Sequence, residues 1–177
     1  MQEPTSACLV VVDVQVGFRG PHTASTYEQI PSLFPRYERI LFSRFENRVE
    51  SPVYQFKGWR GMMAGAPETE LALDVSALEQ PHFITRKSSF TALIPAALEW
   101  LCGQGVDQVD ICGNDTDLCV TMTARDAMEH GIRPRILADY CCSTAGEPIH
   151  SNALLQLKRL VGPGNVVTAN RGAVAAT

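Results

Sequence analysis

The sequence has no cluster of positive charge and no long hydrophobic run. Its 15 Lys and Arg residues are scattered among 19 Asp and Glu residues, which gives 177 residues a net charge of −4. Nucleic-acid-binding surfaces and membrane-binding helices need basic patches, so we expect neither kind of partner. The apolar run Ala7–Val12 stops at Asp13, too short for a signal peptide or a membrane span. We therefore expect a cytoplasmic protein that acts on a small-molecule substrate.

Motifs for metals and nucleotide cofactors are also missing. The six cysteines show no C-x-x-C spacing and the four histidines show no paired ligand spacing, so the sequence predicts no metal site. A dinucleotide-binding fold needs Gly-x-Gly-x-x-Gly directly after its first strand, whereas residues 13–18 contain one glycine, Gly17. We expect no cofactor. The chain is not a small secreted protein, so reduced thiols are expected.

Short apolar segments rich in Val, Ile and Phe alternate with helical patterns along the chain. The predicted strands are Cys8–Val12, Ile40–Phe45, His82–Thr85, Gln108–Cys112, Arg135–Ala138 and Asn165–Thr168. The predicted helices are Tyr27–Arg39, Ile94–Cys102, Thr116–His130 and Pro148–Val161. Continuous apolar runs are typical of strands buried on both faces of a parallel sheet. We predict one α/β domain over residues 1–177, a three-layer doubly wound (Rossmann-like) fold with helices on both faces of the sheet.

The segment Ser51–Pro81 interrupts this alternation. It contains several prolines and glycines together with aromatic residues such as Trp59. Long irregular connections in compact domains are commonly functional or mobile. Two interpretations stay open here: a lid or pocket wall over the edge of the sheet, and a surface loop whose aromatic residues close a small hydrophobic cluster.

Three reactive side chains follow three of the predicted strands. Asp13 ends the first strand, Lys87 follows the third, and Cys119 lies in the first helical turn after the fourth. Open α/β folds bind ligands at the carboxyl ends of their strands. A carboxylate can take a thiol proton, an ammonium can hold that carboxylate ionised, and the sulfur can attack a carbonyl. Each residue alone is better explained as a cap, a solvated charge or a core cysteine, so the combination carries the prediction.

These segments resemble the isochorismatase-like cysteine hydrolases, which include nicotinamidases, N-carbamoylsarcosine amidases and isochorismatases. The resemblance covers most of the chain and rests on Val12–Gln15 with Phe18, Lys87–Phe90, Gly113–Val120, Thr123–Ala127, and Asp139–Ser143 followed by His150. It implies a six-stranded parallel sheet in the order 3-2-1-4-5-6 and a catalytic triad of Asp13, Lys87 and Cys119. The third strand lies about 10 Å from the first at normal strand spacing, so we expect Lys87 to bend back over the second strand from a loop.

The resemblance also implies a cis peptide bond at Asn114-Asp115 and an oxyanion hole made by the backbone N–H groups of Asp115 and Cys119. The sequence departs from the family here, because relatives generally carry small or apolar residues at positions 114 and 115. An ionised Asp115 facing the oxyanion would oppose it. We expect this carboxylate to point away, to be neutral, or to recognise a cationic or donor-rich substrate.

A second departure concerns metal. Nicotinamidases of this family carry an Asp-x-His metal motif just after the second strand, and the matching positions here are Phe45-Glu46-Asn47. Phenylalanine cannot ligate a metal, so a nicotinamidase activity is disfavoured. We expect Asn47 to bind substrate as a neutral hydrogen-bonding group. Phe18, Trp59 and Phe90 are the other predicted substrate-binding residues, as walls of the pocket.

The sequence therefore predicts a cysteine-dependent hydrolase of a small amide, ureido or related carbonyl compound, acting through a thioester on Cys119. Two alternatives stay open. One is isochorismatase-type hydrolysis of a vinyl ether with Asp13 as the acid, and the other is a non-catalytic relative that binds a small molecule. The presence of Cys119 favours acyl chemistry. The resemblance also implies a homo-oligomer, either a dimer or a tetramer.

Overall fold

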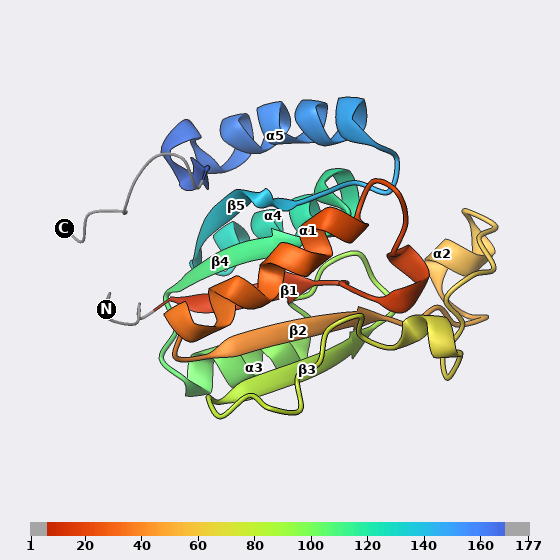
Figure 1. Ribbon diagram of the computed structural model, residues 1–177, viewed down its shortest axis with the longest axis horizontal. Helices are drawn as coiled ribbons and strands as arrows, with labels where there is room; N and C mark the ends of the chain where they lie inside the picture. The colour runs from red at the N-terminus through yellow and green to blue at the C-terminus, as the bar shows by residue number, and fades with distance from the viewer. Residues whose placement is uncertain (1–6, 169–177) are drawn as a thin grey trace.

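Six parallel strands form the centre of the computed structural model, which describes residues 7–168 (Figure 1). Their order is β3-β2-β1-β4-β5-β6, so the predicted fold class and strand order are confirmed. The strands are β1 Cys8–Val12, β2 Ile40–Phe45, β3 His82–Lys87, β4 Gln108–Gly113, β5 Arg133–Cys141 and β6 Val166–Val167. The prediction of one domain over residues 1–177 includes both chain ends, which lie outside the described residues.

Strand β1 shows why the central strands have unbroken apolar sequences. All five of its residues are buried. Cys8, Val10 and Val12 pack into one hydrophobic cluster, whereas Leu9 and Val11 pack into a second cluster on the opposite face. Successive side chains of a strand point to opposite faces, so a strand covered on both sides must be apolar at every position. Burying each Val or Leu contributes about 1.5–3 kcal/mol, which makes the centre of the sheet the main hydrophobic core.

Helices cover both faces of this sheet (Figure 1). Their bounds are α1 Ala24–Gln29, α2 Pro52–Gln55, α3 Pro95–Gly103, α4 Thr121–Glu129 and α5 Glu147–Val161. Apolar residues of α3, α4 and α5 join the cluster on one face, and those of α1 with the following 3₁₀ helix Ile30–Arg36 join the cluster on the other. None of the helices within residues 7–168 is both long enough and apolar enough to cross a membrane.

The predicted helix Tyr27–Arg39 differs from the observed one. The α-helix begins earlier, at Ala24, and changes to a 3₁₀ helix at Ile30 that ends at Arg36. Two prolines lie in this second part. Proline has no N–H to donate to the preceding turn, which explains why regular α-helix does not continue.

Several other boundaries also moved, mostly where polar residues extend an element. Strand β3 continues past Thr85 to Lys87, which lies opposite Phe45 of β2, and β5 is longer than the predicted Arg135–Ala138 at both ends. The predicted helix starting at Thr116 begins as a π-helical turn, Thr116–Val120, before α4. The predicted bounds of both strands were too short, because hydrophobic periodicity does not detect polar residues that hydrogen bonds between strands hold in the sheet.

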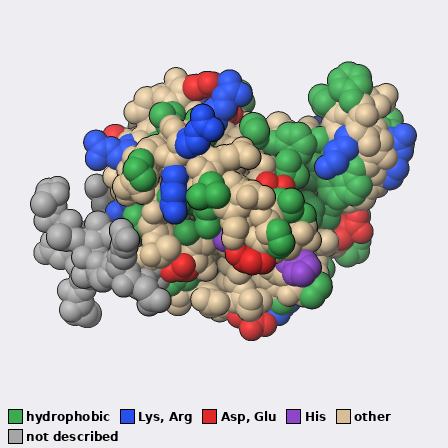
Figure 2. All heavy atoms as spheres, turned by 90° about the horizontal axis from the view of Figure 1, so that it is seen from above, with side chains coloured by type: hydrophobic (Ala, Val, Ile, Leu, Met, Phe, Trp, Pro, Cys, Tyr) green, Lys and Arg blue, Asp and Glu red, His purple; other side chains and the backbone are tan. Residues whose placement is uncertain are grey.

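The segment Ser51–Pro81 contains α2 and the 3₁₀ helix Pro67–Thr69. Figure 2 shows the part around α2 as a lobe standing out from the body of the molecule, with hydrophobic and Lys or Arg side chains on its surface. Phe56 of this part is 89% exposed, whereas Trp59 packs against a small cluster at the sheet edge that contains Phe45 and Met62. The satellite cluster is therefore present, and it also borders the site described below.

Gly113, the last residue of β4, generates the first prediction. Its φ is +110°, and a Cβ built on it would lie 2.1 Å from the carbonyl oxygen of Val12. We expect Gly113→Ala to lower the free energy of unfolding in urea by at least about 2 kcal/mol, because an alanine there is strained and clashes with backbone.

Gly103 in α3 provides the control. A Cβ on it would meet nothing within 4 Å, so Gly103→Ala should stabilise the protein by about 0.5–1 kcal/mol through helix propensity. Equal unfolding midpoints for the two variants would contradict this account of β4.

Candidate active site

Asp13 lies directly after β1 at the carboxyl edge of the sheet. Its φ is +51°, in the left-handed region that residues other than glycine seldom adopt. The Asp13 N–H donates to the hydroxyl of Ser43 on β2 at 3.2 Å, and that hydroxyl donates to Asp13 Oδ1 at 2.6 Å. Both residues are fully buried. One buried hydroxyl therefore contacts both the backbone and the side chain of this carboxylate residue.

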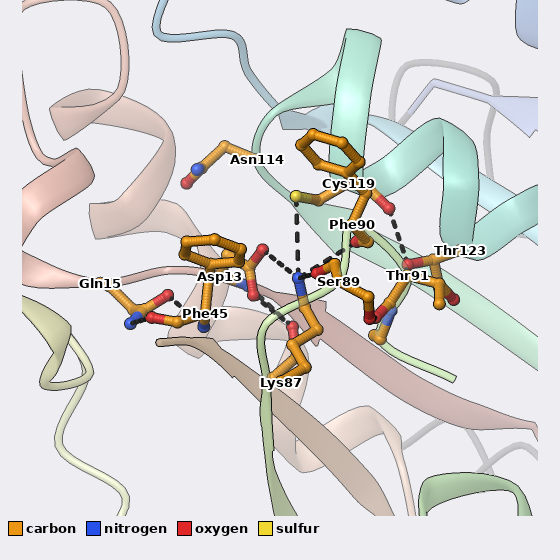
Figure 3. Close-up of polar contacts among 12 residues, drawn as sticks. Asp13, Gln15, Phe45, Lys87, Ser89, Phe90, Thr91, Asn114, Cys119 and Thr123 are labelled. Atoms are coloured by element: carbon orange, nitrogen blue, oxygen red, sulfur yellow. Dashed lines mark hydrogen bonds and ion pairs between the residues drawn. The ribbon is translucent and has the colours of Figure 1, made fainter. Parts of the chain in front are cut away.

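Lys87 reaches Asp13 from two strands away. Its Nζ lies 2.7 Å from Asp13 Oδ2, and Figure 3 shows the ammonium between Asp13 and Cys119. It also donates to the carbonyls of Ser89 at 3.0 Å and Phe90 at 3.1 Å, which completes the three hydrogen bonds of an ammonium. From the sequence, this side chain was expected to come from a loop. It extends instead from the last residue of β3. A long lysine side chain spans the intervening strand without a backbone detour.

The charge of Lys87 is kept by its neighbours. Burial alone lowers the pKa of this ammonium, but the negative charge of Asp13 and the contacts with Asp13 and Cys119 oppose that effect and leave the pKa raised. The ammonium stays protonated at neutral pH, so the site contains a permanent positive charge with no exposure to solvent. That charge offsets the charge of the Asp13 carboxylate 2.7 Å away, at a position where neither side chain is exposed.

Cys119 lies in the π-helical turn that follows β4. Its sulfur is 3.7 Å from Lys87 Nζ, and the residue is 8% exposed. The hydroxyl of Thr123 donates to the Cys119 carbonyl at 2.7 Å and accepts from the N–H of Ala92 at 2.9 Å, which ties the turn to the segment after Lys87. The three side chains that the sequence singled out are thus brought together at one edge of the sheet.

The sulfur rests as a thiol. Burial raises the pKa of Cys119 well above its usual range, and although the Lys87 charge lowers it, the charge of Asp13 and a hydrogen bond with Asp13 raise it further. A start-of-helix position and a nearby ammonium would by themselves favour a thiolate. Burial outweighs both here. A proton must therefore leave the sulfur when it attacks a substrate, and Asp13 is the neighbouring base.

The peptide bond between Asn114 and Asp115 is cis, as the family resemblance implied. The Asn114 side-chain oxygen accepts a hydrogen bond from the Tyr27 hydroxyl. The Asp115 carboxylate accepts from the N–H and the hydroxyl of Thr144, at 2.7 and 2.8 Å, so it is turned toward the loop after β5. Burial, partly opposed by these bonds, raises the pKa of Asp115. Both features reduce its repulsion of a negative charge near the turn.

Aromatic rings border the buried polar groups. Phe18, Trp59 and Phe90 are each partly exposed and pack against the cluster that contains Phe45. The Trp59 ring stacks at 6.1 Å from Phe18 and at 5.6 Å from Phe45, whose ring centre is 5.3 Å from Lys87 Nζ. These residues come from the segment after β1, the end of β2 and the two loops beyond. They form apolar surroundings for the ammonium and the thiol.

Asn47 has no hydrogen-bonding capacity left for a substrate. Its side-chain NH₂ donates to the carbonyls of Trp59 and Gly61, at 2.9 and 3.2 Å. Its side-chain oxygen accepts from the Arg48 N–H at 3.0 Å and the Ser51 hydroxyl at 2.7 Å. An amide offers two donors and two acceptor positions, and all four are occupied by the segment that follows β2. The substrate contact expected from the sequence is replaced by a structural role.

The donor set at the end of β2 does not fit a divalent ion. Phe45 has no ligating atom, Asn47 is fully engaged, and the Glu46 carboxylate between them pairs with Arg44 at 3.4 Å and Arg86 at 3.7 Å. Nowhere in residues 7–168 do three or more His, Cys, Asp or Glu side chains gather as metal ligands. Of the two positions where the resemblance implied metal ligands, residue 45 is a ring in the aromatic cluster and residue 47 is an amide bonded within its own segment.

Sequence reasoning missed Ser43. It lies in the middle of a buried strand, beside Val12 in the register of β1 and β2. The signal was a hydroxyl in an otherwise largely apolar strand, because a buried hydroxyl needs a partner. The sequence alone did not indicate that this partner is Asp13.

Comparisons with known proteins agree with this fold. Residues 7–171 match the family model described as "Isochorismatase domain". Over 97 residues the chain is 31% identical to the nicotinamidase/pyrazinamidase of Mycobacterium tuberculosis (strain ATCC 25618 / H37Rv). This alignment covers 48% of the chain and 50% of the relative, so the match spans about half of that protein's length.

Solved structures share the fold over nearly the whole chain. A nicotinamidase of Bacillus subtilis has a TM-score of 0.79 at 19% identity, covering 93% of this chain and 99% of that one. An isochorismatase-like hydrolase from Alkaliphilus metalliredigens has a TM-score of 0.76 at 18% identity, covering 94% and 95%. A pyrazinamidase of Pyrococcus horikoshii, solved in complex with zinc, has a TM-score of 0.73 at 22% identity, covering 93% and 99%.

The buried ion pair generates the second prediction. Lys87→Met leaves the Asp13 charge buried without its partner, so we expect a loss of about 3–5 kcal/mol in the free energy of urea unfolding. Arg125→Ala is the control, because it removes an ion pair with Glu129 in which both side chains are 56% exposed. That change should cost less than about 1 kcal/mol. Similar small losses in both variants would mean that the Asp13–Lys87 pair is not buried as described.

Proposed function

The chain belongs to the isochorismatase family of hydrolases, and we propose that it hydrolyses a small amide, ureido or related carbonyl compound through a thioester on Cys119. One observation carries this proposal. The Lys87 ammonium contacts both Asp13 Oδ2, at 2.7 Å, and Cys119 Sγ, at 3.7 Å, and the Lys87 and Asp13 side chains have no exposure to solvent. A thiol beside a carboxylate base, with a fixed positive charge between them, is an arrangement suited to nucleophilic catalysis on a carbonyl.

The first half of the reaction forms the thioester. Cys119 Sγ attacks the substrate carbonyl carbon while its proton passes to Asp13, and the carbonyl oxygen becomes an oxyanion. Backbone N–H groups of Asp115 and Cys119 hold that oxyanion, each lowering the barrier by roughly 3–4 kcal/mol. Asp13 then passes the proton to the leaving nitrogen as the C–N bond breaks, and an amine or ammonia departs.

The second half returns the site to its resting state. A water molecule attacks the thioester carbon while Asp13 takes one of its protons. The C–S bond breaks, the acid product leaves, and Asp13 returns the proton to the sulfur. Lys87 keeps its proton throughout and offsets the negative charge that moves between Asp13, the sulfur and the oxyanion.

Aromatic walls define the substrate class. We propose that Phe18, Trp59 and Phe90 line the acyl part of the pocket, since their partly exposed rings pack beside the buried reactive groups. Such walls suit an uncharged, apolar or flat substituent on the reacting carbonyl. Asn47 is not part of this proposal, because its side chain is fully used within its own segment.

The vinyl ether alternative is less well supported. It uses Asp13 as the acid and gives Cys119 no part in the reaction. It also leaves the contact of Cys119 with Lys87 without a purpose. A cytoplasmic location and assembly into a dimer or tetramer are further parts of the proposal, which fractionation and sedimentation velocity can test.

Replacing the nucleophile gives the third prediction. We expect Cys119→Ala to lower turnover at least about a thousandfold on a substrate found by screening amides, ureides and isochorismate, because the thioester route is lost. Mass spectrometry of the wild type during turnover should find an acyl adduct on Cys119. Cys102→Ser, which changes the exposed cysteine, should keep full activity. Full turnover by the alanine variant would refute the thioester mechanism.

The aromatic cluster at the end of β2 gives the fourth prediction. We expect turnover to be unchanged after treatment with a strong chelator and unchanged by added zinc, because the residues present do not fit a divalent ion. The measurement compares initial rates before treatment, after dialysis against the chelator and after metal is added back. Loss of activity that metal restores would contradict this expectation.

A further inference from the structure

We propose that Ser43 is a positioning residue for Asp13, holding its backbone and its carboxylate in the orientation that receives the proton of Cys119. This inference rests on the proposed function, because it assigns Ser43 to the base of that reaction. Ser43 belongs to β2 and its hydroxyl contacts the backbone and the carboxylate of Asp13, so its effect on the sulfur passes through Asp13.

The geometry of the contact is a closed ring of two hydrogen bonds. The Ser43 hydroxyl accepts from the Asp13 N–H at 3.2 Å and donates to Asp13 Oδ1 at 2.6 Å. Backbone and side chain of Asp13 are thus tied to one oxygen atom. Rotation of the carboxylate breaks the shorter bond, and relaxation of the left-handed backbone conformation, with φ +51°, breaks the longer one. Conformations of this kind persist only where the surroundings impose them.

The two carboxylate oxygens of Asp13 have different partners. Oδ2 pairs with Lys87 at 2.7 Å and Oδ1 accepts from Ser43. With both ends held, the carboxylate plane is fixed relative to the sulfur. A base held at a fixed angle transfers a proton much faster than one that samples several rotamers, and misplacement by about 1 Å can cost a hundredfold in rate. Ser43 is the part of this arrangement that carries no charge.

Thr85 provides a contrast within the same sheet. It lies directly opposite Ser43 in the register of β2 and β3, and it is equally buried. Its hydroxyl has no hydrogen-bond partner within residues 7–168, whereas the Ser43 hydroxyl makes two hydrogen bonds. A polar side chain at this level of the sheet is therefore not sufficient to engage the site. Thr85→Val removes a hydroxyl of the same depth without touching Asp13, which makes it a matched control.

The titratable groups around Asp13 are the same in all the variants compared below. Lys87 reaches it from β3 and Cys119 from the π-helical turn. The Tyr27 hydroxyl of α1 lies 3.4 Å from the Asp13 carbonyl oxygen. The carboxylates of Asp115 and Asp13 interact through their charges. A pH shift between the parent and a Ser43 variant therefore reports on the lost hydroxyl.

Alkylation of Cys119 by iodoacetamide tests the inference without knowledge of the substrate. The parent protein in these experiments is the Cys102→Ser variant, which lacks the exposed thiol, and every other substitution is added to it. In the reaction the sulfur forms a bond to carbon, iodide leaves, and the thiol proton passes to Asp13. Peptide mass spectrometry gives the rate at Cys119 between about pH 4 and pH 8, and circular dichroism checks that each variant is folded.

We expect Ser43→Ala to slow this alkylation at least about tenfold at neutral pH. Its rate should also fall off at a higher pH than in the parent, because a carboxylate that loses a hydrogen-bond donor binds a proton more readily. Ser43→Thr keeps the hydroxyl and should recover the parent rate to within about threefold. Thr85→Val should match the parent in both rate and pH profile.

The possible failures are distinguishable. If Cys119 of the parent reacts no faster than the other buried cysteines, the proposed function fails. If Cys119 reacts selectively but Ser43→Ala keeps the parent rate and pH profile, the positioning role of Ser43 is overturned. Should Ser43→Ala not fold, Ser43→Gly replaces it, since it also removes the hydroxyl and adds no titratable group. The same slowing and the same direction of pH shift are expected, and their absence overturns the inference.

Discussion

The structure depends on one buried ion pair, between Asp13 and Lys87, whose side chains have no exposure to solvent. Removing two charges from water costs several kcal/mol for each ion, and their attraction offsets this only when the remaining hydrogen bonds are also made. Here those hydrogen bonds are made. The Lys87 ammonium also donates to the carbonyls of Ser89 and Phe90, and the Asp13 carboxylate also accepts from the hydroxyl of Ser43. Hydrophobic residues of similar volume often stabilise a core as well as, or better than, such a pair. We therefore attribute the pair to the role that we propose for it, holding the base beside the Cys119 thiol.

The topology of the sheet makes that pair possible. Strand β1 is central, so Asp13 emerges in the middle of the carboxyl edge, next to the turn after β4 that carries Cys119. Lys87 comes from two strands away and needs its full length to arrive. Gly113 allows β4 to approach the Val12 carbonyl closely before the chain turns. Each of the three reactive groups is therefore placed by backbone geometry, with burial and charge adjusting its ionisation afterwards.

The sequence was informative where apolar pattern and chemistry coincide. The bounds of β1 and β2 were predicted to the residue. Strand β1 is an apolar run closed by Asp13, and β2 has four apolar residues around Ser43 and Arg44. Asp13, Lys87 and Cys119 were singled out because each is a reactive residue next to such a run. Ser43 could not be identified this way, because its importance depends on which strand lies beside it.

The roles of other residues, Asn47 and Cys119 among them, could be identified only from their contacts in the folded structure. Asn47 has the chemistry of a ligand-binding residue, and only the path of the following chain shows that its amide is occupied. Burial of the Cys119 thiol likewise depends on residues from several elements, so its raised pKa could not be predicted from the sequence. Local pattern predicts candidates, whereas competition among partners in space decides what each candidate does.

The four hydrogen bonds of Asn47 have a consequence for how the surface of this protein can change. They anchor the chain on both sides of Trp59 to the end of β2, so the intervening residues project from a fixed base. A segment anchored in this way can exchange its outer side chains while its attachment points stay in place. A few outward residues beside the reactive groups can then be replaced, which changes substrate selectivity while the reactive residues keep their positions.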